Sequence, residues 1–241
     1  MEKEEYQHHI SQKFNEEMAS VRAHLLEMGG MVEAQAANAT EALVSGNEDL
    51  ARSVLNVEKK INELEKTIDE ECSRIIVLRQ PAASDLRMII AVSKAVADLE
   101  RIGDEASKIA KMALELHEEG ESPRGYMEVR HISSHVRSML RDVLDAFARS
   151  DVEKAVQVAK EDTTVDAEYG TAMRSLATFM MEDPRAISKV LNVIWALRSL
   201  ERIGDHARNI GEQVIYLVQG QDVRHLTVDE MQEQVNEGAK R

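Results

Sequence analysis

A hexapeptide, Leu-Glu-Arg-Ile-Gly-Asp, occurs twice in this chain of 241 residues, at positions 99–104 and again at 200–205. The apolar residues on either side of the two copies also share one spacing, so that Val92 matches Val193. A repeat of this kind indicates two related halves, each forming the same supersecondary unit. The fold must therefore be one that the same pattern of residues can build twice.

Each half contains three stretches in which apolar residues recur at intervals of three and four, the spacing of an amphipathic helix. Aromatic residues make up only 3% of the chain, and a composition this poor in strand formers favours helices. We therefore predict an all-α fold of two three-helix bundles related by an internal repeat. The helices are expected at about 8–45, 48–79, 84–116, 126–149, 151–181 and 184–219.

A polar segment in the middle of the chain separates the two sets of helices. It contains Gly120, Pro123 and Gly125, which favour turns and loops. The predicted organisation is an N-terminal three-helix bundle over residues 1–118, a linker over 119–125, a C-terminal three-helix bundle over 126–220 and a polar C-terminal tail over 221–241.

Local signals predict how individual helices begin, bend and end. Gly29 and Gly30 interrupt the first helix, and adjacent glycines predict a kink or a loosened turn there. We expect residues 1–7 to be a frayed tail, and Ser84 or Asp85 to cap the third helix. The C-terminal tail is expected to contain a short helical stretch and to end in disorder.

The charge of the chain limits its partners. Its formal net charge is −14, which disfavours nucleic acid and anionic lipid surfaces because both attract basic proteins. The longest apolar stretch is interrupted by Lys94 and is too short to span a bilayer, and residues 1–5 form no apolar signal segment. We therefore expect a soluble cytoplasmic protein that binds no nucleic acid and does not insert into a membrane.

Cys72 is the only cysteine in the chain, so no intrachain disulfide can form. It falls on the apolar stripe of the second helix, and this position predicts a buried and inert thiol rather than a nucleophile.

The repeated hexapeptide places two carboxylates one helical turn apart in each half. Glu100 and Asp104 form one pair, and Glu201 and Asp205 form the other, because residues four apart share a helix face. Both pairs fall opposite the apolar stripe, so we expect them on the outside of the bundle, away from its core. Like charges one turn apart and a glycine inside a helix both weaken the helix. A pattern kept twice at this cost indicates a function, and carboxylate donors favour Mg²⁺, Ca²⁺, Mn²⁺ or iron.

Further acids occur at the same four-residue spacing on the preceding helix. In the second half these are Asp162 and Asp166, whereas the first half has Glu58 and Asn62 at the matching positions. Two carboxylates cannot complete a metal site, so we expect Asp162 and Asp166 to supply further ligands. Asn62 carries no charge, and the first half therefore offers one acid fewer at this place.

Two other interpretations of these residues stay open. The carboxylate pairs can be solvated helix faces, and Arg101 and Arg202 can form exposed ion pairs with neighbouring acids. The alternative with chemistry is a carboxylate-bridged di-metal helical-bundle enzyme, whose ferritin-like members use two Glu-x-x-His units. Glu128-x-x-His131 has this spacing and a second unit begins at Glu5, but neither shares a helix with the hexapeptide.

The chain resembles the PhoU family over roughly residues 8–220. The resemblance is carried by the doubled hexapeptide on the third and sixth helices of a double three-helix bundle. Further segments that match the family are residues 28–32, 79–87, 145–149, 180–183 and 220–222.

The resemblance implies a cytoplasmic negative regulator of phosphate uptake and phosphate-starvation signalling. Such a protein is a metal-binding adaptor, not an enzyme, between the ATPase of a phosphate ABC transporter (PstB-like) and a sensor histidine kinase (PhoR-like). It also implies a homodimer that binds divalent or transition metal ions such as Mg, Mn, Fe, Zn or Ni. The metal ligands that it implies are Glu100, Asp104, Glu201, Asp205, Asp162 and Asp166.

Overall fold

The computed structural model describes residues 2–120, 122 and 124–238, and for residues 2–11 it describes the backbone. These residues form helices joined by short turns, with no strand among them. None of the described helices is long and apolar enough to cross a bilayer. The helices are α1 (Glu2–Ser45), α2 (Glu48–Arg79), α3 (Ala83–Glu119), α4 (Tyr126–Arg149), α5 (Val152–Glu182), α6 (Ile187–Gln219) and α7 (Val228–Gly238), with a 3-10 turn, η1 (Pro184–Ala186), before α6.

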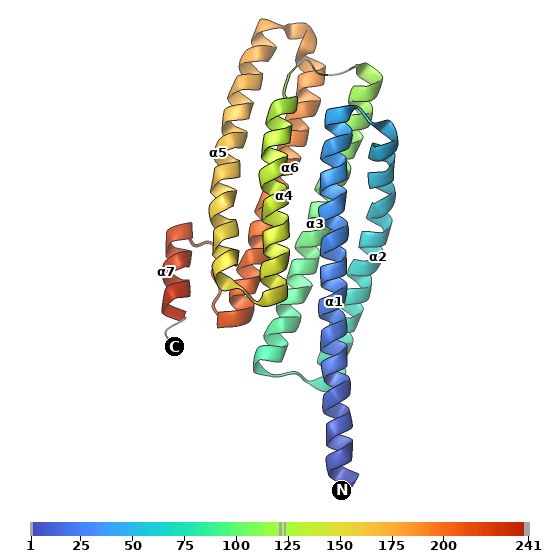
Figure 1. Ribbon diagram of the computed structural model, residues 1–241, viewed down its shortest axis with the longest axis vertical. Helices are drawn as coiled ribbons and strands as arrows, with labels where there is room; N and C mark the ends of the chain where they lie inside the picture. Colours follow the sequence, from blue (N-terminus) through green and yellow to red (C-terminus); the bar gives the residue numbers. More distant parts are fainter. Residues whose placement is uncertain (1, 121, 123, 239–241) are drawn as a thin grey trace.

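The predicted fold class is confirmed, since α1–α3 form one three-helix bundle and α4–α6 form the second (Figure 1). The bundles pack side by side through equivalent helices, α3 against α6 and α1 against α4. α2 contacts only α1 and α3, and α5 contacts helices of its own bundle and α7. The helices that carry the hexapeptide therefore meet at the centre, and α2 and α5 cover them from opposite flanks. Division of the chain into separate domains at 119–125 stays a prediction.

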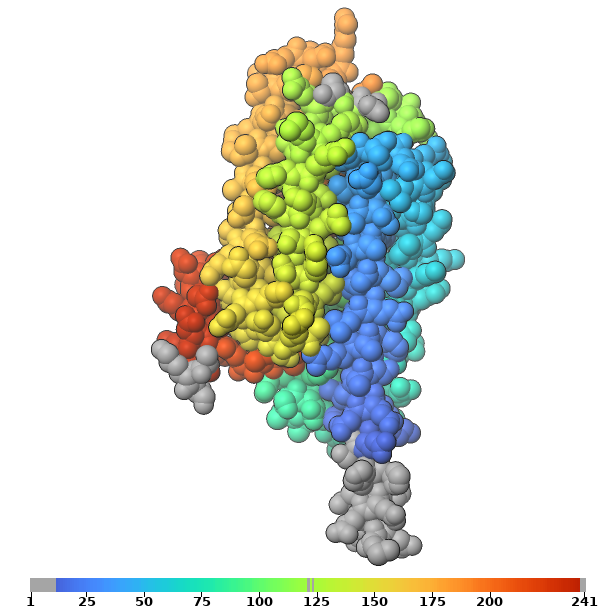
Figure 2. All heavy atoms as spheres, viewed as in Figure 1, coloured from blue at the N-terminus to red at the C-terminus, as the bar shows by residue number. Residues whose placement is uncertain are grey.

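One apolar core runs through both bundles. Its buried side chains come from every helix from α1 to α7 and form a single contiguous cluster. The surface along α1 and α4 is closely packed where the two bundles meet (Figure 2). Cys72 lies in this core as predicted, and burial raises the pKa of its thiol to about 11. That pKa keeps the sulfur protonated and unreactive near neutral pH.

Most helix ends follow from local capping signals. Asn47 accepts a hydrogen bond from the Leu50 backbone N–H at 3.0 Å, and Asp151 does the same for Lys154 at 3.0 Å, so each caps the helix that follows it. The expected ends of the second and fourth helices agree with α2 and α4. A short helical stretch in the C-terminal tail is confirmed by α7, while the expected disorder falls on residues 239–241, outside the described residues.

Two local predictions are wrong. α3 begins at Ala83, after Ala82, which provides no side-chain cap, so neither Ser84 nor Asp85 caps this helix. α1 begins at Glu2 and includes most of the expected frayed tail. Glutamate and lysine, which dominate the first residues of this helix, have high helix propensity.

α1 continues through the paired glycines, and the kink or loosened turn expected there stays a prediction. Gly29 is buried and serves packing against α4: a Cβ atom there would lie 2.3 Å from Leu144 Cδ2. Gly30 is exposed, and a Cβ atom there would meet nothing within 4 Å. The first glycine therefore allows α1 and α4 to approach, and the second has no packing role.

Polar side chains cross the central contact between α3 and α6. His206 Nδ1 lies 2.9 Å from Asp98 Oδ1, and both residues are 8% exposed. Asn209 donates to the same carboxylate at 3.1 Å, and Arg202 Nε lies 3.2 Å from Glu105 Oε1. The hexapeptide arginine of the second half thus pairs with an acid of the first bundle, and these contacts fix the position of α6 along α3.

The two glycines of α1 give a matched test of this packing. Gly30→Ala should raise the free energy of unfolding by about 1 kcal/mol, the difference in helix propensity between the two residues. Gly29→Ala gains the same propensity but has to displace Leu144, so we expect no net gain or a loss. Urea unfolding of both variants measures the difference, and equal stabilisation by the two substitutions would contradict the close contact between α1 and α4.

His206→Leu should lower the free energy of unfolding by about 3–5 kcal/mol, because it leaves the buried Asp98 carboxylate without its histidine partner. The double variant Asp98→Leu/His206→Leu removes the stranded charge and should recover much of this loss. Denaturant unfolding with a chelator present compares the two. A double variant no more stable than His206→Leu would show that the pair is not the source of the loss.

Candidate metal centre

Helices α5 and α6 bring together the acids predicted in the second half. Asp162 and Asp166 lie one turn apart on α5, and Asp205 approaches them from α6. One carboxylate oxygen of each lies within 4.8 Å of one oxygen of the other two. Glu201 lies one turn before Asp205, near enough for the charges of Asp205 and Asp166 to raise its pKa. These four residues are called the C-terminal acidic site.

The hexapeptide acids of α6, Glu201 and Asp205, do not lie on the outside of the bundle, contrary to what their spacing predicts. Asp162 is 1% exposed and Glu201 is 9% exposed, while Asp205 is half-buried and Asp166 is exposed. The prediction is wrong because it gives α6 a single apolar face. α6 packs against α3, α4 and α5, so its acidic side faces α5 rather than solvent.

Gly204 of the hexapeptide allows α5 to come this close. It is buried, and a Cβ atom there would lie 3.2 Å from Asp162 Oδ1 and 3.6 Å from Met139 Cε. Any side chain at this position would press on the Asp162 carboxylate. An interior glycine destabilises α6 by about 1 kcal/mol. It stands where the Asp162 carboxylate of α5 approaches the backbone of α6.

The protein leaves part of the negative charge of this site uncompensated. Asp162 Oδ1 and Glu201 Oε2 are buried and have no hydrogen-bond partner among the residues that the structure describes. Arg208 Nη1 lies 3.5 Å from Asp162 Oδ2, at the outer limit of a hydrogen bond. The same guanidinium donates to the Leu226 carbonyl at 3.3 Å and lies 3.6 Å from Glu212. Its charge is therefore shared among three acceptors.

Burial and mutual repulsion change the acidity of these groups. Burial, followed by the charges of Asp166 and Asp205, raises the pKa of Asp162 to about 6, against a smaller opposing effect of Arg208. Burial is also the first cause of the raised pKa of Asp205 and of Glu201. Without a cation the site holds protons more tightly than ordinary carboxylates, because its charged form is both desolvated and crowded.

Helices α2 and α3 form a related group in the first half, called the N-terminal acidic site: Glu58, Glu65, Glu100 and Asp104. All four are half-buried. Burial, followed by the charges of Asp104 and Glu65, raises the pKa of Glu100. The sequence analysis missed Glu65. It follows Asn62 by three residues and Glu58 by seven, so helical spacing places it on the same face.

The two acidic sites differ in their chemistry. The described residues of the first bundle contain no trio of acids as close together as Asp162, Asp166 and Asp205. At Gly103 the neighbouring group is an uncharged amide, since a Cβ atom there would lie 3.2 Å from Gln35 Oε1. The first repeat thus has an amide oxygen where the second has a buried carboxylate.

The Glu-x-x-His unit identified in the sequence takes no part in either acidic site. His131 Nε2 lies 3.0 Å from Glu168 Oε1, on the side of α5 that faces α4, and Glu128 lines the same pocket. The structure therefore does not bring this unit to the hexapeptide, as a ferritin-like di-metal centre would require.

The C-terminal acidic site fits a hard divalent cation by the nature of its donors. Carboxylate oxygens are the ligands that such ions prefer. Asp162 Oδ1 is buried without a partner, and an unsatisfied buried carboxylate oxygen is costly unless a cation meets it. Asp162, Asp166, Glu201 and Asp205 would hold the ion, which would supply the positive charge that Arg208 supplies only in part.

Fold and site together define a protein of two repeated three-helix bundles, each with carboxylates gathered between its second and third helices. The model of the PhoU domain matches residues 25–113 and 129–214, one match in each bundle. The chain belongs to the PhoU family, and the resemblance seen in its hexapeptides is confirmed.

Relatives and solved structures agree with this assignment. The chain is 62% identical over 233 residues to the phosphate-specific transport system accessory protein PhoU homolog of Pseudomonas aeruginosa, covering 97% of this chain and 96% of that protein. The crystal structure of PhoU from P. aeruginosa matches with a TM-score of 0.85 and 63% identity, over 86% of this chain and 100% of that chain. The phosphate transport system regulatory protein PhoU from Streptococcus pneumoniae matches with a TM-score of 0.80 and 30% identity, over 87% and 99% of the two chains.

Asp162→Asn should stabilise the metal-free protein at neutral pH. The folded-state pKa of Asp162, about 6, lies above its ordinary value of 3.8, so the folded protein binds this proton more tightly than the unfolded chain. Wild-type stability should therefore fall as the pH rises from about 4 to about 6, and the variant should lose this dependence. The gain near pH 7 is expected to reach at most about 3 kcal/mol.

Denaturant unfolding in chelator, at about pH 4.5 and about pH 7, measures this effect. Asp229→Asn, an exposed aspartate on α7, is the control and should change little. If Asp162→Asn were no more stable than the wild type at neutral pH in chelator, the Asp162 carboxylate would not be under strain.

Proposed function

We propose that this protein is a cytoplasmic negative regulator of phosphate uptake and phosphate-starvation signalling. It acts as a metal-binding adaptor between a phosphate ABC transporter and a sensor histidine kinase, and not as an enzyme. The P. aeruginosa relative is named an accessory protein of the phosphate-specific transport system, and the S. pneumoniae protein a phosphate transport system regulatory protein. Those names support the role for this chain.

The observation that carries the metal-binding part of the proposal is the buried, unpartnered Oδ1 of Asp162 beside two further carboxylates. Three acids this close repel one another. The guanidinium of Arg208 is shared with other acceptors, and that of Arg198 is paired with Glu201 Oε1. A divalent ion at this place relieves both the repulsion and the desolvation cost.

The adaptor role follows from charge and rigidity. The chain has a net charge of −14, so bare acidic sites repel acidic surfaces on partner proteins at short range. An ion bound on α6 changes that local charge without any movement of the helices, because the shared core holds α3 and α6 in place. Metal occupancy would thereby control docking of the transporter ATPase and of the kinase. This control would act in the same way whether the protein is a homodimer or a single chain.

Metal content should depend on the hexapeptide acids. Elemental mass spectrometry of untagged wild type is compared with Glu201→Gln/Asp205→Asn and with Glu100→Gln/Asp104→Asn. We expect metal in the wild type, a large loss in the first variant and a smaller loss in the second, because the second repeat has the more closely grouped carboxylates. The control is Asp229→Asn/Glu233→Gln, an exposed acid pair of the same spacing on α7.

Equal metal in all four proteins, or none in any, would overturn the metal-binding part of the proposal. Docking is then measured with the purified kinase cytoplasmic region and transporter ATPase. Chelator should weaken binding of the wild type, and the added ion should restore it. Binding that is indifferent to both would show that the acids contact the partner directly or not at all.

A further inference from the structure

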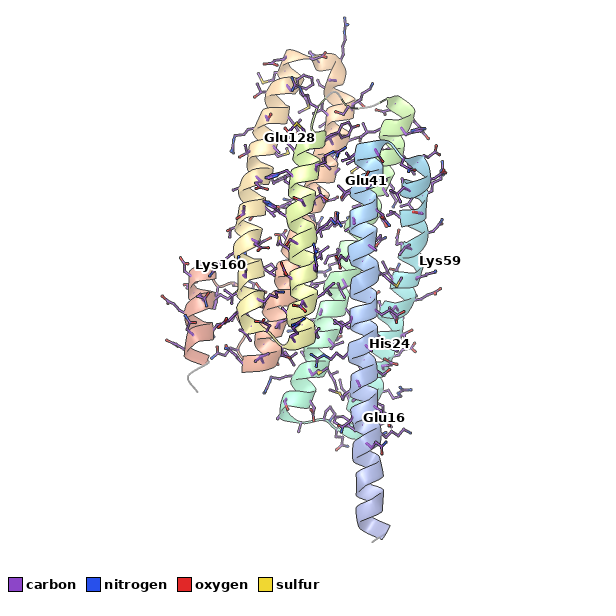
Figure 3. All side chains as sticks on the ribbon, in the orientation of Figure 1. Glu16, His24, Glu41, Lys59, Glu128 and Lys160 are labelled. Atoms are coloured by element: carbon purple, nitrogen blue, oxygen red, sulfur yellow. The ribbon has the colours of Figure 1, made fainter. Side chains whose placement is uncertain are left out.

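A second group of metal-ligating side chains lies between α4 and α5, apart from both acidic sites. His131 and His135 are one turn apart on α4, and Glu168 approaches both from α5. One ligand atom of each lies within 4.8 Å of the other two. Figure 3 labels Glu128 on α4 and Lys160 on α5; the group follows Glu128 by one turn and Lys160 by about two.

The geometry of this group suits coordination of a single ion. His131 Nε2 lies 3.0 Å from Glu168 Oε1, and His135 Nδ1 lies 3.2 Å from Glu168 Oε2. In a tetrahedral zinc site with bonds of about 2.0–2.2 Å, neighbouring ligand atoms are separated by about 3.3 Å. The two imidazoles also converge, with ring centroids 4.8 Å apart.

Hydrogen bonding satisfies only one oxygen of this carboxylate, Glu168 Oε1, which is bonded to His131 Nε2. Glu168 Oε2 is enclosed and has no hydrogen-bond partner among the described residues. His135 Nδ1 is near it, but the pair does not have the geometry of a hydrogen bond. An enclosed oxygen that lies 3.2 Å from an imidazole nitrogen and is left unbonded is placed as a ligand atom rather than as half of a surface ion pair.

The donor set selects a different class of ion from that of the acidic sites. Imidazole nitrogen favours Zn²⁺ and the neighbouring transition metals, whereas carboxylates alone favour Mg²⁺, Ca²⁺ and Mn²⁺. Two histidines and one carboxylate are a three-ligand set that leaves a coordination position open. The group borders a pocket of about 480 Å³, and the His131 side chain is 62% exposed, so water or a small ligand can reach that position.

We propose that His131, His135 and Glu168 form a Zn²⁺ site that links α4 to α5, independent of the acidic sites. The histidines come from the first three turns of α4 and the carboxylate from the middle of α5. The ion therefore joins two helices that otherwise meet through apolar contacts and through the ion pairs of Lys154 with Asp142 and Asp145. Its open position faces solvent, where a water molecule or a ligand from outside the chain completes the coordination.

Titration of the untagged protein with Co²⁺, followed by displacement with Zn²⁺, tests this site. A four- or five-coordinate Co²⁺ with nitrogen ligands absorbs visible light far more strongly than a six-coordinate Co²⁺ held by carboxylates, so the acidic sites contribute little to the signal. The wild type is expected to develop intense absorption that one equivalent of Zn²⁺ abolishes. Absence of such absorption would overturn the proposal.

Three variants assign the signal to residues. His131→Ala and Glu168→Gln each remove one ligand of the ion. Loss of an outer-shell partner weakens metal binding by about 10–100-fold, so loss of a ligand should weaken Zn²⁺ binding by more than that. Ser134→Ala is the matched control, because Ser134 is exposed on α4 between the two histidines and should bind like the wild type. Circular dichroism checks that all three fold. Unchanged affinity in folded His131→Ala and Glu168→Gln would rule the site out.

One further variant separates this site from the proposed function. Glu201→Gln/Asp205→Asn alters the C-terminal acidic site and should keep the Co²⁺ absorption intact. Loss of the absorption in this variant would place the ion at the acidic site and overturn the proposal. Failure of the histidine site would leave the metal content measured for the acidic sites unaffected, so the two hypotheses stand or fall separately.

Discussion

The contact between α3 and α6 is the constraint on which the other features depend. Asp98, His206, Glu105 and Arg202 are polar groups inside the most extensive helix contact of the molecule. Apolar side chains tolerate sliding of one helix along another, whereas these pairs hold only at one register. Because Arg202 belongs to the hexapeptide and His206 follows it directly, the same contacts that join the bundles also orient the acids of α6 toward α5.

The two repeats then use one backbone plan for unequal sites. Each has a hexapeptide glycine against which a polar side chain from another helix packs, a carboxylate at Gly204 and an amide at Gly103. The amide comes from α1 and the carboxylate from α5, so different helices supply the neighbour of each glycine. The second repeat therefore concentrates negative charge, and the first spreads its acids more widely along α2 and α3. A duplicated sequence motif does not ensure duplicated chemistry, because the residues packed against it come from elsewhere in the chain.

The sequence predicted the helices well where local chemistry decides the outcome. Asn47, Asp151 and the segment that ends at Pro81 set helix ends through their own caps and ring geometry. Burial of Glu201 and Asp162 could not be predicted in this way, because periodicity describes one face while α6 is covered from three sides. The packing role of Gly29 could not be predicted for a related reason, since only the position of Leu144 on α4 explains it. The partner of His131 lies 37 residues away, and no local spacing connects the two.

The guanidinium of Arg208, which contacts three acceptors, connects the segment between α6 and α7 to the C-terminal acidic site. Its bond to the Leu226 carbonyl anchors the side chain to the segment between α6 and α7, and this anchoring keeps it at the edge of Asp162. A rearrangement of that segment would release the guanidinium to move closer to the carboxylate or away from it. Cation affinity and the conformation of the segment between α6 and α7 are therefore thermodynamically linked. A molecule that binds this segment either lowers or raises the affinity of the acidic site for the ion.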